Sequence, residues 1–146
     1  MSAYHVTWCT YCSRPPRWAQ RHFPYAAVRL LPEEEIIVAQ SIASTIKAHG
    51  LDVFAFSVCE DHVHIALDCD AEHLPKIIHL LKGRSARGVR QAHKSRHDHV
   101  NHLWGKSYHA VGIFTDGYLD AVITYIHRNR RRHGLPYNEE LEDLFL

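Results

Sequence analysis

The chain has 146 residues, a formal net charge of +1 and a hydrophobic content of 46%. This length suits one domain with its own core, and the composition is typical of a globular protein. No apolar run approaches the ~18 residues of a membrane span, and the N-terminus lacks the basic and apolar segments of a secretory signal. We therefore expect a single domain over residues 1–146, located in the cytoplasm and not bound to a membrane.

Hydrophobic periodicity predicts four strands and three main helices. In chain order they are strand 4–10, helix 32–49, strand 51–59, strand 62–67, helix 71–92 or 74–92, strand 107–115 and helix 118–131, with a short helix after residue 136. This order predicts an α+β fold, in which a ferredoxin-like antiparallel sheet (β-α-β-β-α-β) carries two helices on one face. The third long helix is extra and is free to lie on the open face.

Charge is unevenly distributed along the chain. Residues 82–133 hold eleven Lys and Arg against three Asp and Glu, whereas residues 1–81 hold six against nine. A basic block of this size is the usual electrostatic signature of a nucleic-acid contact, although a merely solvated basic face would give the same counts. The four cysteines do not form two zinc-type pairs, so we expect neither a structural zinc site nor a disulfide.

Two histidines stand two residues apart at the start of a predicted strand. Because successive side chains of a strand point to opposite faces, His62 and His64 share one face and Val63, Ile65 and Leu67 share the other. The apolar face is expected in the core. The two imidazoles can bind one divalent ion and leave most of its coordination sphere open, although two surface histidines would give the same pattern.

The last long helix carries a phenol and a carboxamide on one flank. At ~100° per residue, Tyr125 and Asn129 lie one turn apart at the edge of the apolar stripe of this helix. A tyrosine near basic residues can attack a phosphodiester if a metal polarises the phosphate, and an amide oxygen can bind that metal. Taken alone, the same two residues could be a boundary aromatic and a helix-end polar residue.

Five segments, in the same order, resemble the single-tyrosine HUH endonucleases, which are the transposases of insertion sequences that move as single-stranded DNA. They are the opening strand at 4–8, the His-x-His motif with its preceding aspartate at 61–64, the basic helix segment at 81–87, the Leu-Trp-Gly-Lys-Ser-Tyr segment at 103–108 and the tyrosine motif at 125–129. The resemblance covers roughly residues 4–133.

The resemblance implies that His62 and His64 bind Mg²⁺ or Mn²⁺, with Asp61 supporting them. It implies that Tyr125 attacks the scissile phosphate, which gives a 5′-phosphotyrosine intermediate and a free 3′-OH. The implied substrate is single-stranded DNA with a hairpin, and Tyr108 is a further candidate for stacking on a base. The implied DNA contacts are Lys82, Arg84, Arg87, Arg90, Trp104, Lys106, Arg128 and Arg131.

The sequence departs from the insertion-sequence enzymes at Asn129, where they usually carry Gln. Asn at this position resembles the REP-associated tyrosine transposases, which act on repeated palindromes. Asn is one methylene shorter than Gln, so whether Asn129 is the third metal ligand stays open. The short length of the chain and the segment at 103–108 favour the insertion-sequence type, whose enzymes work as dimers. We therefore expect a homodimer in which the tyrosine helix of one chain reaches the histidine pair of its partner.

Two other functions remain open at this stage. The chain could be a domesticated palindrome-binding protein with weak or no transposition activity. It could also be a metal-dependent hydrolase of a non-nucleic substrate, with a third histidine such as His109. Within the transposase hypothesis, Tyr118 is a rival nucleophile, because it lies seven residues before Tyr125 on the same helix flank.

Overall fold

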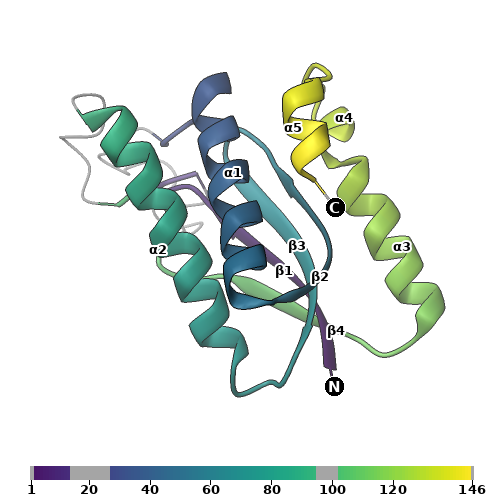
Figure 1. The fold of residues 1–146 in the computed structure, drawn as a ribbon. Helices are drawn as coiled ribbons and strands as arrows, with labels where there is room; N and C mark the ends of the chain where they lie inside the picture. The colour runs from purple at the N-terminus through teal and green to yellow at the C-terminus, as the bar shows by residue number, and fades with distance from the viewer. Residues whose placement is uncertain (1, 14–26, 95–101, 146) are drawn as a thin grey trace, which may run out of the picture.

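The structure is a computed structural model that describes residues 2–13, 27–94 and 102–145. Four antiparallel strands form one sheet in the spatial order β2-β3-β1-β4. The strands are β1 (Ser2–Cys9), β2 (Asp52–Val58), β3 (His62–Cys69) and β4 (His109–Ile113). Together with helices α1 (Pro32–His49) and α2 (Leu74–Ala92), they give the ferredoxin-like arrangement, so the predicted fold is confirmed (Figure 1).

Helix α1 begins and ends where local chemistry favours it. A proline occupies its first turn, and the Glu34 carboxylate accepts the backbone N–H of Leu31 at 2.9 Å. Gly50 ends the helix in the left-handed conformation, at φ +59°, which a glycine adopts without strain. Glu34 and Glu35 are both buried, which is unusual for carboxylates in a first helical turn.

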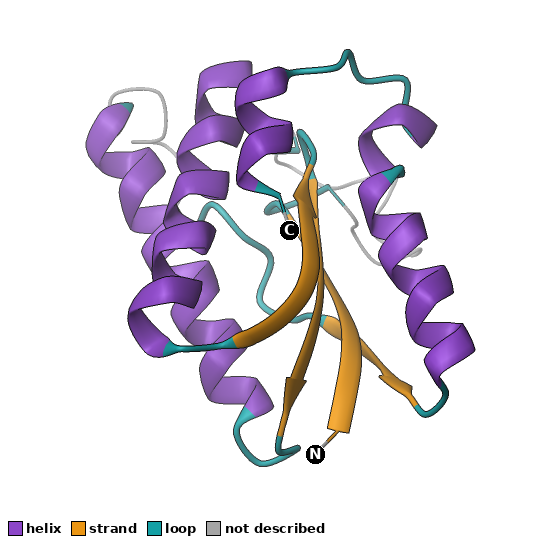
Figure 2. Ribbon diagram, turned by 45° about the vertical axis from the view of Figure 1, so that its right-hand side comes forward, coloured by secondary structure: helices purple, strands orange, loops and turns teal. Residues whose placement is uncertain are grey.

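The two faces of the sheet are covered differently, with helices on both sides of the strands (Figure 2). Val63, Ile65 and Leu67 of β3 are buried in the larger hydrophobic cluster, together with residues of α1 and α2. On the opposite face, Ala66 packs in a smaller cluster with Val122 of helix α3 (Asp116–His127). The pleat of β3 therefore separates the main core from the face that carries the histidines, as the alternation predicts.

The predicted helix 118–131 is interrupted, so the expectation of one continuous helix was wrong. Helix α3 ends at His127, and a single short turn, α4 (Asn129–Arg132), follows after Arg128. Asn129 and Arg130, the first two residues of α4, are both buried, at 0% and 5% exposure.

The chain ends with a short helix, α5 (Glu139–Leu144), which packs beside α1. Leu141 is fully buried, and the ring centroids of Phe145 and Phe56 are 5.4 Å apart. The predicted docking of the C-terminal tail is therefore confirmed. Within the described ranges, no helix combines the length and the apolar character that crossing a bilayer requires.

Candidate active site

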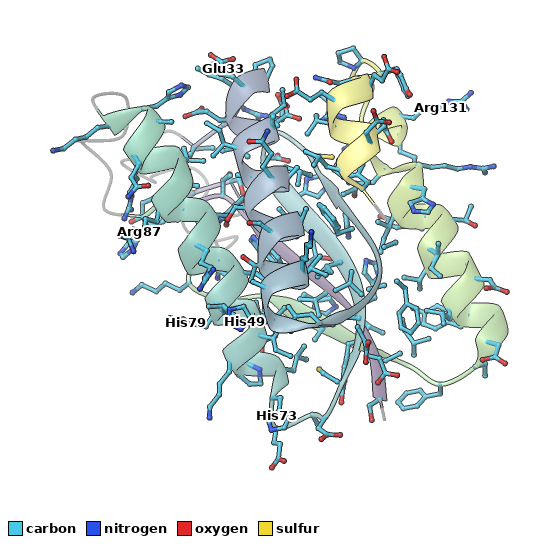
Figure 3. All side chains as sticks on the ribbon, in the orientation of Figure 1. Glu33, His49, His73, His79, Arg87 and Arg131 are labelled. Atoms are coloured by element: carbon cyan, nitrogen blue, oxygen red, sulfur yellow. The ribbon has the colours of Figure 1, made fainter. Side chains whose placement is uncertain are left out.

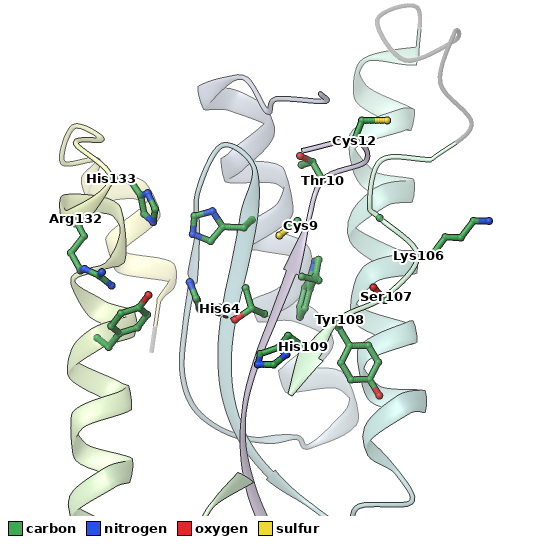
Figure 4. Close-up of a pocket in the computed structure, with 15 residues that line it drawn as sticks. Cys9, Thr10, Cys12, His64, Lys106, Ser107, Tyr108, His109, Arg132 and His133 are labelled. Atoms are coloured by element: carbon green, nitrogen blue, oxygen red, sulfur yellow. Dashed lines mark hydrogen bonds between the residues drawn. The ribbon is translucent and has the colours of Figure 1, made fainter. Parts of the chain in front are cut away.

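His62 and His64 lie on the face of β3 that points toward α3, and both side chains are buried. Their ring centroids are 5.0 Å apart, and the ring planes are nearly perpendicular at 89°. They line a pocket of about 730 Å³ together with Tyr125, Arg132 and His133 of the C-terminal segment. Figure 4 shows Arg132 and His133 facing His64 across this pocket. The pocket therefore joins two parts of the chain that are about sixty residues apart.

A carboxylate orients the first histidine. Asp61 Oδ1 accepts a hydrogen bond from Nδ1–H of His62 at 2.6 Å. Such a bond fixes the tautomer and leaves the lone pair on Nε2, as in most metal-binding histidines. That Nε2 atom lies 3.0 Å from the amide nitrogen of Asn129. Asp61 thus contacts His62 directly, and its supporting role toward a metal ion stays a prediction.

Strand β1 holds the second histidine. Thr7 is paired with His64 across the sheet, and Thr7 Oγ1 and His5 Nε2 lie 3.0 and 2.9 Å from His64 Nδ1. Burial, reinforced by the neighbouring His62, lowers the pKa of His64 to about 3. The ring is therefore neutral at pH 7, which is the form of histidine that binds a metal ion.

Tyr125 stands on α3 opposite the histidine pair of its own chain. Its ring centroid is 5.4 Å from that of His64, and its side chain is 37% exposed. The guanidinium carbon of Arg132 lies 4.3 Å from the centre of the phenol ring, in a cation–π contact. One chain therefore supplies both the phenol and the imidazoles that line this pocket.

The carboxamide of Asn129 is fully buried between two side chains. Its Nδ2 donates to Cys59 Sγ at 3.0 Å and lies 3.0 Å from His62 Nε2. Burial raises the pKa of the Cys59 thiol to about 12, so this sulfur stays protonated and accepts the amide N–H as a neutral group. Asn129 is thus fixed against the first histidine rather than exposed at a helix end.

A buried ion pair anchors the residue next to Asn129. Arg130 Nη1 donates to Glu35 Oε2 of α1 and, at 3.0 Å, to the carbonyl of Val58 at the end of β2. Its Nη2 donates to the carbonyl of Pro136 at 3.3 Å. The guanidinium therefore ties α4 to α1 and to β2. Because Asn129 is adjacent in the chain, these bonds also set its position.

The donors that converge here fit a divalent metal ion. His62 and His64 both line the pocket, and imidazole suits divalent transition metals. The Oδ1 atom of Asn129 is buried and has no hydrogen-bond partner within the described part of the chain. A half-turn of the amide would bring this oxygen to the His62 side, and amide oxygen is a ligand for Mg²⁺ and Mn²⁺. These three residues could therefore hold such an ion.

The sequence profile of the IS200-like transposases matches residues 2–129, which is most of the chain. The chain belongs to this transposase family. It is therefore an enzyme of DNA transposition that cuts DNA, and members of the family generally use a divalent metal ion. A search among curated proteins gave no match. The hydrolase hypothesis with a third histidine has no support from these comparisons.

Two solved structures share the fold of this transposase. One is a REP-associated tyrosine transposase bound to a REP hairpin, with a TM-score of 0.58 and 12% identity over 92% of this chain and 70% of that one. The other is a proposed transposase from Deinococcus radiodurans R1, with a TM-score of 0.57 and 24% identity over 88% of this chain and 91% of that one. At these identities the likeness establishes the fold alone.

A second cluster of the transposase could bind a cation but is far from the pocket. Asp70, Glu72 and His73 bring their ligand atoms close together, and all three are exposed. They follow the C-terminal end of β3, whereas His62 opens that strand. Eight strand residues span roughly 25 Å, so this cluster does not belong to the site that contains Tyr125.

The predicted DNA contacts of the transposase fall into two regions. Five of them are exposed, namely Arg84, Arg87, Lys106, Arg128 and Arg131. Arg90 is half-buried and makes another interaction. Figure 3 shows Arg87 pointing outward from α2 and Arg131 pointing outward on the opposite side of the molecule. The basic residues are therefore divided in space, with Arg84 and Arg87 on α2 and Arg128 and Arg131 after α3, on the opposite side of the molecule.

Two of the predicted DNA contacts have structural roles instead. The structure contradicts the prediction that Trp104 stacks on a base, because its ring is only 5% exposed and its indole N–H donates to Ser85 Oγ at 3.0 Å. Lys82 Nζ donates to the carbonyls of Gly105 and Ser107 at 2.7 and 3.1 Å, and burial lowers its pKa. Lys82 therefore braces the 105–107 segment and does not present a free charge to the DNA backbone.

The sequence prediction missed four residues of the pocket region. His5 and Thr7 hold His64, Arg132 lies over Tyr125, and the ring centroid of His133 is 4.8 Å from that of His62. The alternation His5-x-Thr7 on the first strand was the available signal, but its use required the register that pairs Thr7 with His64. His109, which is paired with Thr7 on the other side of β1, lines the pocket as well.

Proposed function

We propose that this transposase is a single-strand DNA endonuclease and strand transferase that uses Tyr125 as its nucleophile. The observation that carries the proposal is the pocket itself, since it brings the Tyr125 phenol opposite His62 and His64. Tyr118, the rival nucleophile, does not line this pocket. A phenol that faces two oriented imidazoles suits phosphoryl transfer through a covalent intermediate.

In the proposed reaction the phenol oxygen of Tyr125 attacks the phosphorus of the scissile phosphate. The bond to the 3′-oxygen breaks, and the 5′-phosphate stays on the tyrosine as a phosphodiester. The phenol loses one proton and the departing 3′-oxygen gains one, which leaves a free 3′-OH. A 3′-OH from another strand can reverse the step and join DNA without ATP, because the covalent link conserves the bond.

The surrounding side chains would prepare this step. A divalent ion, Mg²⁺ or Mn²⁺, held by His62, His64 and Asn129 would polarise the phosphate oxygens when bound. Arg132 lies over the Tyr125 ring and offers N–H donors that can pair with the same phosphate.

We propose single-stranded DNA that contains a hairpin as the substrate. The exposed arginines of α2 and of the C-terminal segment lie on opposite sides of the molecule, and both groups could contact the phosphates of one folded DNA strand. The similar structure that contains a REP hairpin is in line with this substrate class. The exposed positions concerned are Arg84, Arg87, Lys106, Arg128 and Arg131.

For the assembly, we propose that each chain can complete a site with its own tyrosine. Tyr125 reaches the histidine pair of the same chain, so a partner's helix is not needed to fill the pocket. The homodimer expected from the sequence stays a prediction, and exchange of α3 between two copies is the form of it that shares the site.

The experiment is incubation of the protein with end-labelled hairpin DNA in Mn²⁺, followed by separation under denaturing conditions. We expect a covalent adduct that carries the fragment on the 3′ side of the cut, because the 5′-phosphate is the group transferred to the enzyme. Tyr125→Phe should abolish the adduct, and Tyr118→Phe, the matched control, should retain it. The opposite result would move the nucleophile to Tyr118. Tight hairpin binding without cleavage in any divalent metal would favour the domesticated palindrome-binding protein.

A further inference from the structure

A second pocket lies on the other side of Tyr125. Its volume is about 300 Å³. It is lined by His5, Tyr118, Ala121, Val122 and Tyr125, and Tyr125 is the residue that it shares with the histidine pocket. The two pockets are therefore adjacent, with the proposed nucleophile between them.

The position of the second pocket follows from the register of the sheet. His5 is paired with Ala66, two residues beyond His64 along β3, so the pocket lies farther from His62 than the first pocket does. On α3, Tyr118 precedes Tyr125 by seven residues, which is about two helical turns on one flank. A DNA strand that passes over the Tyr125 phenol can thus reach both pockets in succession.

The lining of the second pocket suits a flat and uncharged group. Three of the five residues are rings, two are small aliphatic side chains, and none is a carboxylate, a lysine or an arginine. The rings of His5 and Tyr125 meet edge to face, with centroids 5.8 Å apart. The lining offers no lysine or arginine to a phosphate, whereas any of the nucleobases can stack on an aromatic ring.

The side chain of Tyr118 is exposed at the surface of α3. Its ring is 43% exposed, although it stands on the same helix as the buried Val122. Its backbone N–H donates to the side chain of Thr115 at 3.1 Å, which caps the start of α3 and fixes the first turn. An exposed ring on a fixed helix start is a rigid platform for an unpaired base.

We propose that this second pocket binds the unpaired nucleobase of a nucleotide that flanks the scissile phosphate, with Tyr118 as its main stacking surface. The inference rests on the proposed function, because it takes Tyr125 as the residue that contacts the phosphate. It gives Tyr118 a role in holding the strand and none in the covalent step. The contact depends on the ring and not on the hydroxyl, since stacking uses the π face.

The test measures binding and does not depend on cleavage. In the Tyr125→Phe background, the affinity for hairpin DNA is measured while one abasic nucleotide is moved along the strand, position by position. We expect one position at which the abasic nucleotide weakens binding by ~5- to 150-fold, the range that stacking of one base supports. In Tyr118→Leu the same abasic nucleotide should cause no further loss. Tyr118→Phe should behave like the parent protein.

The matched control is Tyr137→Leu, which removes another exposed ring, 77% exposed, that does not line the pocket. This variant should keep the full abasic effect. An abasic effect of equal size in Tyr118→Leu, or none at any position, would overturn the proposal. The proposal would also fail if the nucleotide whose abasic effect depends on Tyr118 were not next to the phosphate that the protein with Tyr125 intact cuts. If no adduct forms, the proposed function fails, whereas coupling between Tyr118 and a single base would still support the base pocket.

Discussion

The two faces of the central sheet differ although the same strands form both. On the face toward α1 and α2, Val63 and Ile65 are fully buried in a continuous apolar core. On the face toward α3, the alternate residues His62 and His64 line a polar pocket, and a smaller apolar cluster packs against α3. The pleat therefore divides the residues that stabilise the core from those that line the pocket, one by one along the same strand.

The two faces are nevertheless joined at the β2 edge of the sheet. The chain leaves the α3 face through α4, and α5 then packs beside α1 on the other face. Arg130 crosses between them, because its guanidinium bonds both Glu35 of α1 and the Val58 carbonyl. Since Asn129 is the neighbour of Arg130, the core face helps to position a candidate metal ligand on the site face.

The largest effect is expected when this connection is broken. Arg130→Met leaves the buried carboxylate of Glu35 without its partner, so we expect a loss of about 3–5 kcal/mol in the free energy of unfolding. Urea denaturation measures it. Arg131→Met, which removes the exposed neighbouring charge, should change stability by less than ~0.5 kcal/mol.

A double replacement separates the charge from the packing. Glu35→Leu combined with Arg130→Met should recover most of the lost stability, because an apolar pair can replace a buried ion pair at little cost. If Arg130→Met is no less stable than Arg131→Met, the two faces are not joined through this ion pair.

A smaller effect, confined to the site face, is expected from Asp61→Asn. This change removes the charge that orients His62, so Mn²⁺ affinity should fall by about 10- to 100-fold, with little change in stability. Isothermal titration with Mn²⁺ and urea denaturation measure the two quantities. Ile65→Val is the matched control on the other face, and it should lose about 0.5–1.5 kcal/mol of stability and keep its Mn²⁺ affinity. Equal losses of metal affinity in both variants would contradict the division between the faces.

The division of β3 could be predicted because it depends only on the period of a strand. His62 and His64 on one side, and Val63, Ile65 and Leu67 on the other, follow from alternation alone. The fold followed in the same way from the order of the elements. Both features are local, or are fixed by connection rules that the sequence displays directly.

The features that the sequence did not reveal depend on contacts between distant segments. The helix break at Arg128 follows from bonds of Arg130 and Asn129 to α1, β2 and Cys59, which no local pattern displays. The burial of Trp104 depends on Ser85 and on the neighbouring Trp8 ring, whereas the resemblance implied a ring available to DNA. In each case tertiary contacts overrode a reasonable local interpretation.

The smallest effect is expected on the outer surface of α2, which covers the core face. If the hairpin contacts this helix, replacing the exposed Arg84 and Arg87 with Gln should make the salt dependence of binding less steep by about 1.5 to 2 in log K against log salt. The cleavage rate at saturating DNA should stay unchanged, because neither residue lines the pocket of Tyr125. Lys76→Gln, which removes an exposed charge from the first turn of the same helix, is the control and should leave the slope as it is. If the slope of log K against log salt is unchanged in the double variant, the DNA does not contact α2. The sheet face that α1 and α2 cover would then contribute to stability and not to DNA binding.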